Sequence, residues 1–448
     1  MTYSSSLVNY LSNEISQSDP MFHENTPLTQ LKKKLLPLFK MSSFPSNKDE
    51  FFRYSKIKET DFDNLEFNHQ PITNTSSSLI LNQFSNYFKY KIIFINGELS
   101  LEQTTLPSGI FLKKITSNEE TQEVMNSLDQ ANFFSLMNIL YSRNLYELTI
   151  PPHYKSSEII SIFHITSGDF KQHLSTPCIF IKALENSYAN LISLHLYLGI
   201  EPYYYVSNSA LYLSLEDGAV IDFSKLQIES ETSLHISTLQ ANLKQNSILN
   251  TQLISLGGNN SRENQKIHLL GQNARANLYG LYDLKNEMQA DHYIDLIHQH
   301  PETYSHQIFK GILRDQSHGV FTGKVSITKD AKHSVSTQLN KNIILGDTAQ
   351  MTSRPQLMID TDDVKCTHGS ATGQMDPEQL FYLKTRGIDD NQAKKMLYHA
   401  FAREIIEASP CGKIKQILNN FILNDADENL SLDLNYSNRC QHGIFSFT

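Results

Sequence analysis

Leucines occupy every second position in Leu211-Tyr212-Leu213-Ser214-Leu215, and a polar turn, Glu216-Asp217-Gly218, follows immediately. Alternate side chains of a β-strand point to opposite faces, so the three leucines share one face. A short strand with one apolar face cannot bury that face alone and must pack against other strands. This part of the chain is therefore predicted to be rich in β-structure.

Similar turns recur at nearly regular intervals. Their central residues lie at 186, 217, 246 and 273, so the successive steps are 31, 29 and 27 residues. Repeats of this length indicate a solenoid, and the period-two alternation makes it a β-solenoid rather than a helical one. The next step is 43 residues, which we attribute to an insertion at 285–291. The five turns are Glu185-Asn186-Ser187, Glu216-Asp217-Gly218, Gln245-Asn246-Ser247, Gln272-Asn273-Ala274 and Asp315-Gln316-Ser317.

We therefore expect a mainly β protein whose core, residues 155–372, is a right-handed parallel β-helix, that is, a β-solenoid. Residues 1–154 should form an N-terminal helical and α+β region that includes a hairpin turn at Asn96-Gly97. Stacked repeats leave an open sheet edge at each end, which needs a cap or a partner. We expect the N-terminal region to cap one end, while the repeats stop near residue 372 at the other.

The end of the chain has a helical pattern. Residues 373–424 are expected to form a helical domain, in which Asp376 caps a first helix and Gly387 ends it. A second helix carries an apolar stripe that includes Leu397, Phe401 and Ile405. Such a stripe serves either internal packing or a partner surface. Residues 425–448 form a C-terminal extension to which the sequence assigns no role.

Composition excludes several classes of function. The 448 residues are 40% hydrophobic and 19% charged, which is typical of a folded globular protein. The formal net charge of −9 argues against a nucleic-acid surface. Nowhere do 18 apolar residues follow one another, so no membrane span is expected. The phosphate-binding pattern Gly-x-x-x-x-Gly-Lys-Ser/Thr is absent, so the chain is not expected to hydrolyse ATP itself.

The cysteines indicate a reducing compartment. Cys178, Cys366, Cys411 and Cys440 are widely spaced and lack the pattern of a disulfide framework. The first residues show neither a basic region nor an apolar region typical of a signal peptide. We therefore expect a cytoplasmic protein.

A candidate metal-binding pair lies where the repeats end. In the predicted strand Asp362-Asp363-Val364-Lys365-Cys366-Thr367-His368-Gly369, Cys366 and His368 project to the same side. A sulfur beside an imidazole nitrogen suits iron, zinc or an iron–sulfur fragment. Two ligands do not complete a tetrahedral shell, so other residues or another chain must supply the rest. The alternative is a half-buried cysteine and a hydrogen-bonded histidine that close a sheet.

The same region closely resembles the C-terminal signature of the SufB/SufD family, the scaffold subunits of the Suf system for iron–sulfur cluster assembly. The Cys366-Thr367-His368-Gly369 run looks like the SufD branch. Looser similarities include a Phe-Ile-Asn-Gly hairpin at 94–97 and a Glu-x-Phe-Arg-Tyr element at 50–54, where the family commonly has Trp at the third position. The matching segments are 353–357, 362–369, 374–383 and 386–388, with weaker matches at 309–313 and 319–323.

The resemblance implies a non-catalytic subunit. Its solenoid would pair with a SufB-like subunit, and its C-terminal helices, with Leu397, Phe401 and Ile405, would bind a Suf ATPase. A cysteine desulfurase would act indirectly. Iron or a nascent iron–sulfur cluster would bind transiently at Cys366 and His368, completed by the partner subunit. The sequence makes no prediction about a flavin, the stoichiometry, or the choice between iron and a preformed cluster.

Two other functions fit parts of the sequence. A SufB-like, cluster-carrying subunit shares the fold, but the Cys-Thr-His-Gly run argues against it. A β-solenoid enzyme that processes polysaccharides would need a cleft of acidic and basic residues, and such enzymes are usually secreted.

A separate set of histidines, His292, His298 and His300, shares strand parity, so the three side chains could lie on one face of a strand. We expect imidazoles stacked between neighbouring turns there rather than a metal site.

Overall fold

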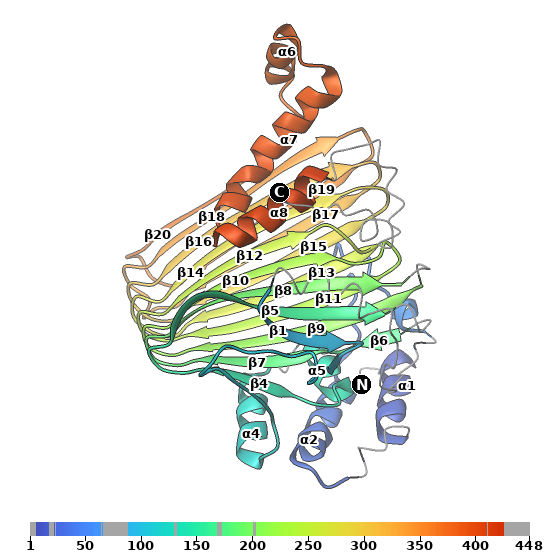
Figure 1. Ribbon diagram of the computed structural model, residues 1–448, viewed down its shortest axis with the longest axis vertical. Coiled ribbons are helices and arrows are strands. Elements are labelled where there is room, and N and C mark those ends of the chain that lie inside the picture. The colour runs from blue at the N-terminus through green and yellow to red at the C-terminus, as the bar shows by residue number, and fades with distance from the viewer. Residues whose placement is uncertain are drawn as a thin grey trace.

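A computed structural model describes residues 6–17, 22, 24–63, 65, 88–129, 132–167, 173–199, 203–409 and 411–424. Two long sheets dominate it and face each other across an apolar interior (Figure 1). One sheet has the order β2-β1-β5-β8-β10-β12-β14-β16-β18-β20, and the other β19-β17-β15-β13-β11-β9-β7-β4-β3. From β7 onward the chain alternates between the sheets, with β6 beside β9. The predicted β-solenoid is therefore confirmed.

Nearly all strand pairs are parallel, and the two antiparallel pairs, β1–β2 and β3–β4, lie at the N-terminal end. The sheets begin before the expected boundary at residue 155, because β1 pairs with β5 and β4 pairs with β7. The early strands are β1 (Tyr90–Ile95), β2 (Glu98–Leu99), β3 (Phe111–Lys114) and β4 (Tyr146–Ile150). The later strands are β5 (Lys155–Ser167), β6 (His173–Ser175), β7 (Cys178–Ala183), β8 (Tyr188–Leu198), β9 (Tyr205–Leu215), β10 (Val220–Ile228), β11 (Leu234–Leu243), β12 (Ile248–Ser255), β13 (Asn260–Leu269), β14 (Arg275–Leu284), β15 (Gln289–His298), β16 (Tyr304–Arg314), β17 (His318–Ile327), β18 (Val335–Leu345), β19 (Gln350–Ile359) and β20 (Lys365–Gly373).

The turns form hydrogen-bonded columns along the solenoid. In one column each turn donates a backbone N–H to the next, from Asn186 through Gly218, Asn246 and Asn273 to Glu302. All five residues have positive φ, a conformation that Gly and Asn adopt most readily. The structure contradicts the predicted insertion at 285–291. This segment connects β14 to β15 at the opposite edge of the solenoid. The turn that follows Asn273 in the column lies instead at Glu302 and was not predicted.

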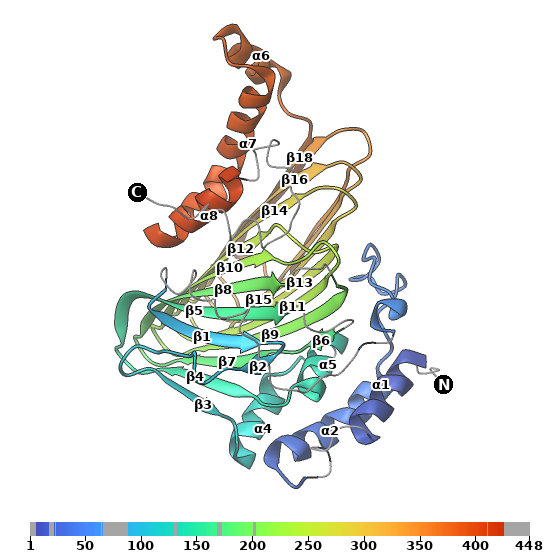
Figure 2. The ribbon, with the colours of Figure 1, turned by 45° about the vertical axis from the view of Figure 1, so that its right-hand side comes forward.

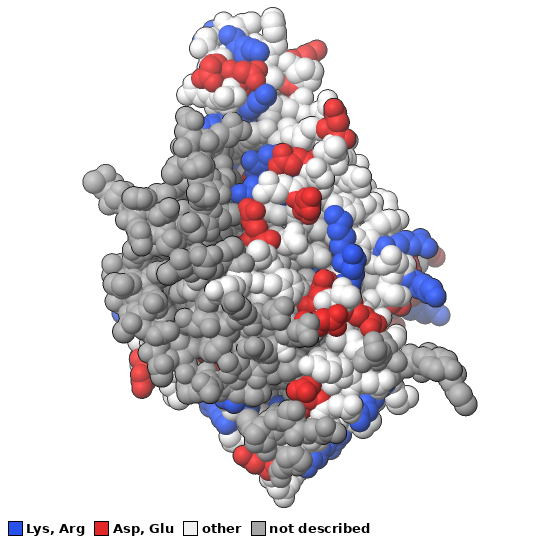
Figure 3. Space-filling model, turned by 90° about the vertical axis from the view of Figure 1, so that its right-hand side faces the viewer, with Lys and Arg blue, Asp and Glu red and all other residues white. Residues whose placement is uncertain are grey.

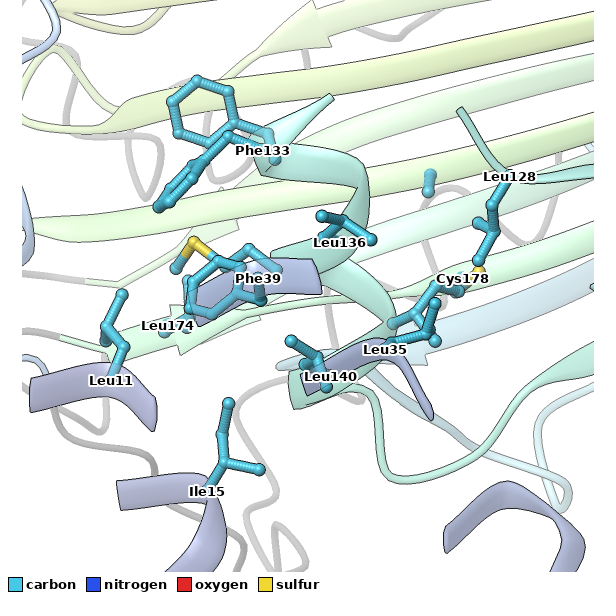
Figure 4. Close-up of a cluster of buried hydrophobic side chains, with 14 of the residues drawn as sticks. Leu11, Ile15, Leu35, Phe39, Leu128, Phe133, Leu136, Leu140, Leu174 and Cys178 are labelled. Atoms are coloured by element: carbon cyan, nitrogen blue, oxygen red, sulfur yellow. The ribbon is translucent and has the colours of Figure 1, made fainter. Parts of the chain in front are cut away.

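Helices cover the end of the solenoid where the chain begins (Figures 1 and 2). Phe39, Phe133, Leu136 and Leu140 pack there in one apolar cluster with Cys178 of the first turn (Figure 4). Asn138 of α5 links this cap to the solenoid, because its side-chain amide donates to the carbonyl oxygens of Pro177 and Asn208. These elements are α1 (Ser6–Gln17), α2 (Pro27–Met41), the 3-10 helix η2 (Glu59–Phe62), α4 (Asn118–Ser127) and α5 (Phe133–Tyr141).

The segment 50–56 lies across the outer face of the β19-containing sheet. The Phe52 ring stacks under the guanidinium of Arg262, with 3.8 Å between the ring centroid and Cζ. Arg354, in β19, donates to the backbone oxygen of Glu50 at 2.8 Å and to its carboxylate at 3.0 Å. An aromatic side chain at position 52 thus has a clear packing role, and the N-terminal region reaches the last turn of the solenoid.

The C-terminal helices are α6 (Pro377–Thr385), α7 (Asp390–Glu407) and α8 (Gly412–Asn424). The side chain of Asp376 caps α6 by accepting from the N–H of Glu378, and Gly387 follows the helix with a φ of +82°. The C-terminal half of α7 packs on the outer face of the sheet at β14 and β16. Its N-terminal half and α6 project beyond the solenoid (Figures 1 and 2). The predicted extension at 425–448 lies outside the described residues.

No helix among the described residues is both long enough and apolar enough to span a membrane. On the face shown in Figure 3, acidic and basic side chains are interspersed. The described part of that face carries no continuous basic surface of the kind that binds nucleic acid.

Candidate metal centre at the open end of the solenoid

The solenoid ends in two strands, β19 and β20, that have a neighbour on one side only. The N–H of Lys365 donates to the carbonyl oxygen of Ser334 at 3.0 Å and so points toward β18. Because successive N–H groups of a strand point in opposite directions, those of Cys366, His368 and Ser370 point away from β18. This end therefore presents unpaired donors and acceptors along β20.

Cys366 and His368 lie on the interior face of β20. Cys366 stands in register with Ser336 of β18, and His368 with Gln338. Ser336 and Gln338 are at most 1% exposed, so their columns run inside the solenoid. Cys366 is half-buried and His368 exposed, because no further turn covers them.

The strand begins later than the sequence suggested, because β20 runs from Lys365 to Gly373. Asp363 lies in the turn before it, at the end of the turn column. Its carbonyl oxygen accepts from the N–H of His333 at 2.6 Å, and its carboxylate lies 3.0 Å from the His333 Nδ1.

The sulfur of Cys366 has a mixed environment. It packs against the apolar side chains of Val325, Ile327 and Ala331 on one side and is open on the other. Partial burial raises the pKa of the thiol, and a hydrogen bond from the Ser336 backbone opposes that rise. The other described cysteines differ: Cys178 is buried in the first turn, and Cys411 lies beside α8. Within the described ranges, no three His, Cys, Asp or Glu side chains form a metal-binding group.

Polar side chains fill the interior of the last turns around Cys366 and His368, whereas Ile and Leu form a large apolar cluster in the earlier turns. The Gln338 side chain donates to Gln307 Oε1 at 3.1 Å, and the column continues to His368. Gly323 faces this column, and a Cβ there would overlap the Gln338 amide. Next to it, the Asn342 amide lies 3.3 Å from Thr372 Oγ1 of β20. The register that aligns these side chains cannot be read from a single strand.

The three histidines singled out by the sequence do not come together in one stack. His292 packs on the rings of Tyr282 and Phe309, with centroid distances of 5.0 and 5.9 Å. His298 hydrogen-bonds to hydroxyl groups, and His300 lies in the turn after β15. Stacked imidazoles do occur, but between His164 and His195, whose ring centroids are 4.4 Å apart.

A buried charged cluster inside the solenoid was missed by the sequence analysis. Lys225 Nζ lies 2.5 Å from Glu263 Oε1, and both side chains are 4% exposed. His235 lies between two carboxylates, 2.6 Å from Glu229 and 3.3 Å from Glu263. Burial opposes ionisation of Glu263, yet the attraction of Lys225 and His235 holds the pKa of its carboxyl below the usual value. No local motif marks this cluster, because its members come from different strands.

The structure separates the three residues of the α7 stripe. Ile405 is fully buried in a cluster with residues of the β20-containing sheet, so it cannot contact a partner while α7 stays in place. Phe401 and Leu397 are both half-buried, and Lys310 Nζ lies 4.6 Å from the centroid of the Phe401 ring. The largest exposed apolar side chains nearby are Phe381, Tyr382 and Met396, at 69%, 56% and 45%.

Comparisons with known proteins agree with this architecture. The family model "SUF system FeS cluster assembly, SufBD core domain" matches residues 163–401. "Protein ABCI7, chloroplastic" of Arabidopsis thaliana is 26% identical over 88% of this chain and 86% of its own length. The "Iron-sulfur cluster assembly protein SufD" of Escherichia coli is 24% identical over 90% and 95% of the two chains. A SufBD family protein of Synechocystis is 24% identical over 72% and 75%.

Proposed function

The chain belongs to the SufBD family of iron–sulfur cluster assembly proteins, and we propose that it is a non-catalytic scaffold subunit whose open solenoid end pairs with a SufB-like solenoid. The observation that carries the proposal is the position of Cys366 and His368 on the interior face of the unpaired strand β20. A partner strand added at this edge would satisfy the outward N–H groups. It would also bring its own ligands to the two side chains.

In this proposal, iron or a nascent cluster is the cargo. The thiolate of Cys366 and a neutral His368 supply two ligands, and the partner solenoid supplies the rest. The apolar wall formed by Val325, Ile327 and Ala331 shields one side of the sulfur from water. The site is therefore incomplete in the isolated chain and forms only when the two solenoids meet.

Pairing at the β20 edge can be tested with one proline. The N–H of Ser370 points away from β18, so Ser370→Pro removes an outward donor and leaves the bonds to β18 in place. We expect this variant to fold but to lose the SufB-like subunit in co-purification. Ser370→Ala is the matched control, because it also removes the 2.8 Å contact between the hydroxyls of Ser370 and Ser353. Normal recovery of the partner by folded Ser370→Pro would argue against edge pairing.

We also propose that the projecting helices bind a Suf ATPase. Leu397 and Phe401 remain candidates for this contact, whereas Ile405 acts from within by fixing α7 on the solenoid. The exposed side chains of Phe381 and Tyr382 extend the candidate surface onto α6. Aromatic side chains often dominate the binding energy of interfaces. Movement of the helices would then reach the solenoid through α7, which packs on β14 and β16.

Replacing Phe381 or Leu397 by Asp should therefore weaken ATPase binding by about tenfold or more while the fold stays intact. The measurement is the affinity for the ATPase subunit, together with circular dichroism. Phe111→Asp is a matched control, since Phe111 is 64% exposed but lies on β3 at the other end of the solenoid. Unchanged affinity in both folded variants would show that the ATPase does not dock here.

A further inference from the structure

A line of hydrogen-bonded side chains runs through the interior of the last turns to Ser336, which stands in register with Cys366. His298 Nε2 lies 2.9 Å from Ser305 Oγ, and the Ser305 hydroxyl donates to Ser336 Oγ at 2.9 Å. Ser336 is in register with Cys366 on the next strand. On the other side of the imidazole, His298 Nδ1 lies 2.8 Å from Thr303 Oγ1. The four polar residues are at most 4% exposed.

The contacts give this line a direction. Ser305 has one hydroxyl proton and donates it to Ser336, so it must accept a proton from His298 Nε2. Burial lowers the pKa of His298 to about 4, so the imidazole is neutral at physiological pH and its Nδ1 carries no proton. The Thr303 hydroxyl, 2.8 Å from Nδ1, has a second acceptor in the carbonyl oxygen of His300 at 3.0 Å and a hydroxyl neighbour, Ser334, at 2.7 Å. The direction of the line is therefore set by the contacts of Ser305.

Ser336 is the last member of the line. Its oxygen already accepts from Ser305, so its own hydroxyl proton is available to the next turn, where the side chain in register is Cys366. The Ser336 backbone also bonds to the same sulfur. Hydrogen bonds donated to metal-bound sulfur tune the metal–sulfur bond and orient the ligand.

We propose that His298, Ser305 and Ser336 are positioning residues that direct a hydroxyl donor at the Cys366 sulfur when this sulfur binds metal. The inference rests on the proposed function of Cys366 and deepens it. It assigns His298 a role that does not require direct contact with the metal. Each member fixes the orientation of the following one, so the hydrogen bonds run in one direction from His298 through Ser305 to Ser336.

His292 provides an internal contrast. It lies on the same strand and the same face as His298 and is equally buried, at 1% exposure. Its neighbours are the rings of Tyr282 and Phe309 rather than hydroxyl groups. Comparing variants of the two histidines therefore distinguishes a role in filling the interior from a role in the hydrogen-bonded line.

The test uses Co²⁺ as a probe for iron in the purified complex of the full chain with its partner subunits. The wild-type complex should show a sulfur-to-cobalt absorption band that disappears in Cys366→Ala. Ser336→Ala should raise the Co²⁺ concentration for half-occupancy about tenfold and shift the band, because it removes the hydroxyl group that stands in register with Cys366. Ser305→Ala and His298→Leu should shift the band in the same direction, whereas His292→Leu should leave it unchanged. Ser336→Thr, which keeps the hydroxyl, should restore the wild-type spectrum.

Ser317→Ala is a matched control for loss of a buried hydroxyl, since Ser317 is fully buried but lies at the opposite edge of the solenoid, in the connection between β16 and β17. A wild-type spectrum and affinity in Ser336→Ala would overturn the inference. If Ser336→Ala does not fold, the spectrum and affinity of Ser305→Ala are compared with wild type instead, and unchanged values would overturn the inference. A wild-type complex without any Cys366-dependent band would instead overturn the proposed metal site, and this inference with it.

Discussion

Lys225→Met should lower the free energy of unfolding by about 3–5 kcal/mol, because it leaves the carboxylate of Glu263 buried without its main partner. The ion pair is 2.5 Å long, and both side chains are 4% exposed. His235 remains 3.3 Å from Glu263 but also serves Glu229, so it cannot replace the ammonium group. Chemical denaturation followed by circular dichroism measures the loss.

Two further variants show whether the unpaired charge is the cause. Lys225→Met combined with Glu263→Gln should regain much of the stability, since no full charge is then left without its partner. Lys266→Met removes the partner of Asp129 in a bridge whose side chains are 29% and 24% exposed, and should cost at most about 1 kcal/mol. A similar small loss in Lys225→Met would contradict the expected energetic role of the buried pair.

The sequence predicted the solenoid because its signals are local. The strands show a period of two, and most turns place Gly, Asn or Asp where the backbone needs a positive φ, as at Asn186, Gly218 and Asn246. The turn at Glu302 was not predicted, because neither Pro301 nor Glu302 is a residue type that commonly adopts a positive φ. Alternation also predicted that Cys366 and His368 project to the same side of a strand, and their register with the buried Ser336 and Gln338 shows that this side is the interior face.

Contacts between strands could not be predicted in the same way. The pairing of Lys225 with Glu263 joins two different sheets, and the line from His298 to Ser336 depends on which residues stand in register. For the same reason, the sequence alone could not show which residues of the α7 stripe are buried against the sheet. Ile405 and Leu397 lie on one apolar stripe of the sequence, yet only the packing of α7 on the sheet shows that Ile405 is covered.

Cys366→Ala and His368→Ala should each strongly reduce the iron and sulfide held by the assembled complex. In the proposed site, each substitution removes one of the two ligands that the described part of this chain supplies, and both residues lie on an open strand where loss of a side chain disturbs little packing. Complex formation and the thermal stability of the isolated chain should therefore remain close to wild type. The proposed site requires Cys366 as a thiolate and His368 as a neutral imidazole, so loading should also weaken on acidification.

The most direct test of the account is the iron and acid-labile sulfide content per complex, measured for both variants at matched purity. Cys411→Ala is the matched control, because Cys411 is also partly exposed but lies beside α8 rather than at the open end. The account predicts a large loss of iron and sulfide in Cys366→Ala and His368→Ala and normal loading in Cys411→Ala. Normal loading in all three variants would contradict it and would show that Cys366 and His368 only close the last turn of the solenoid.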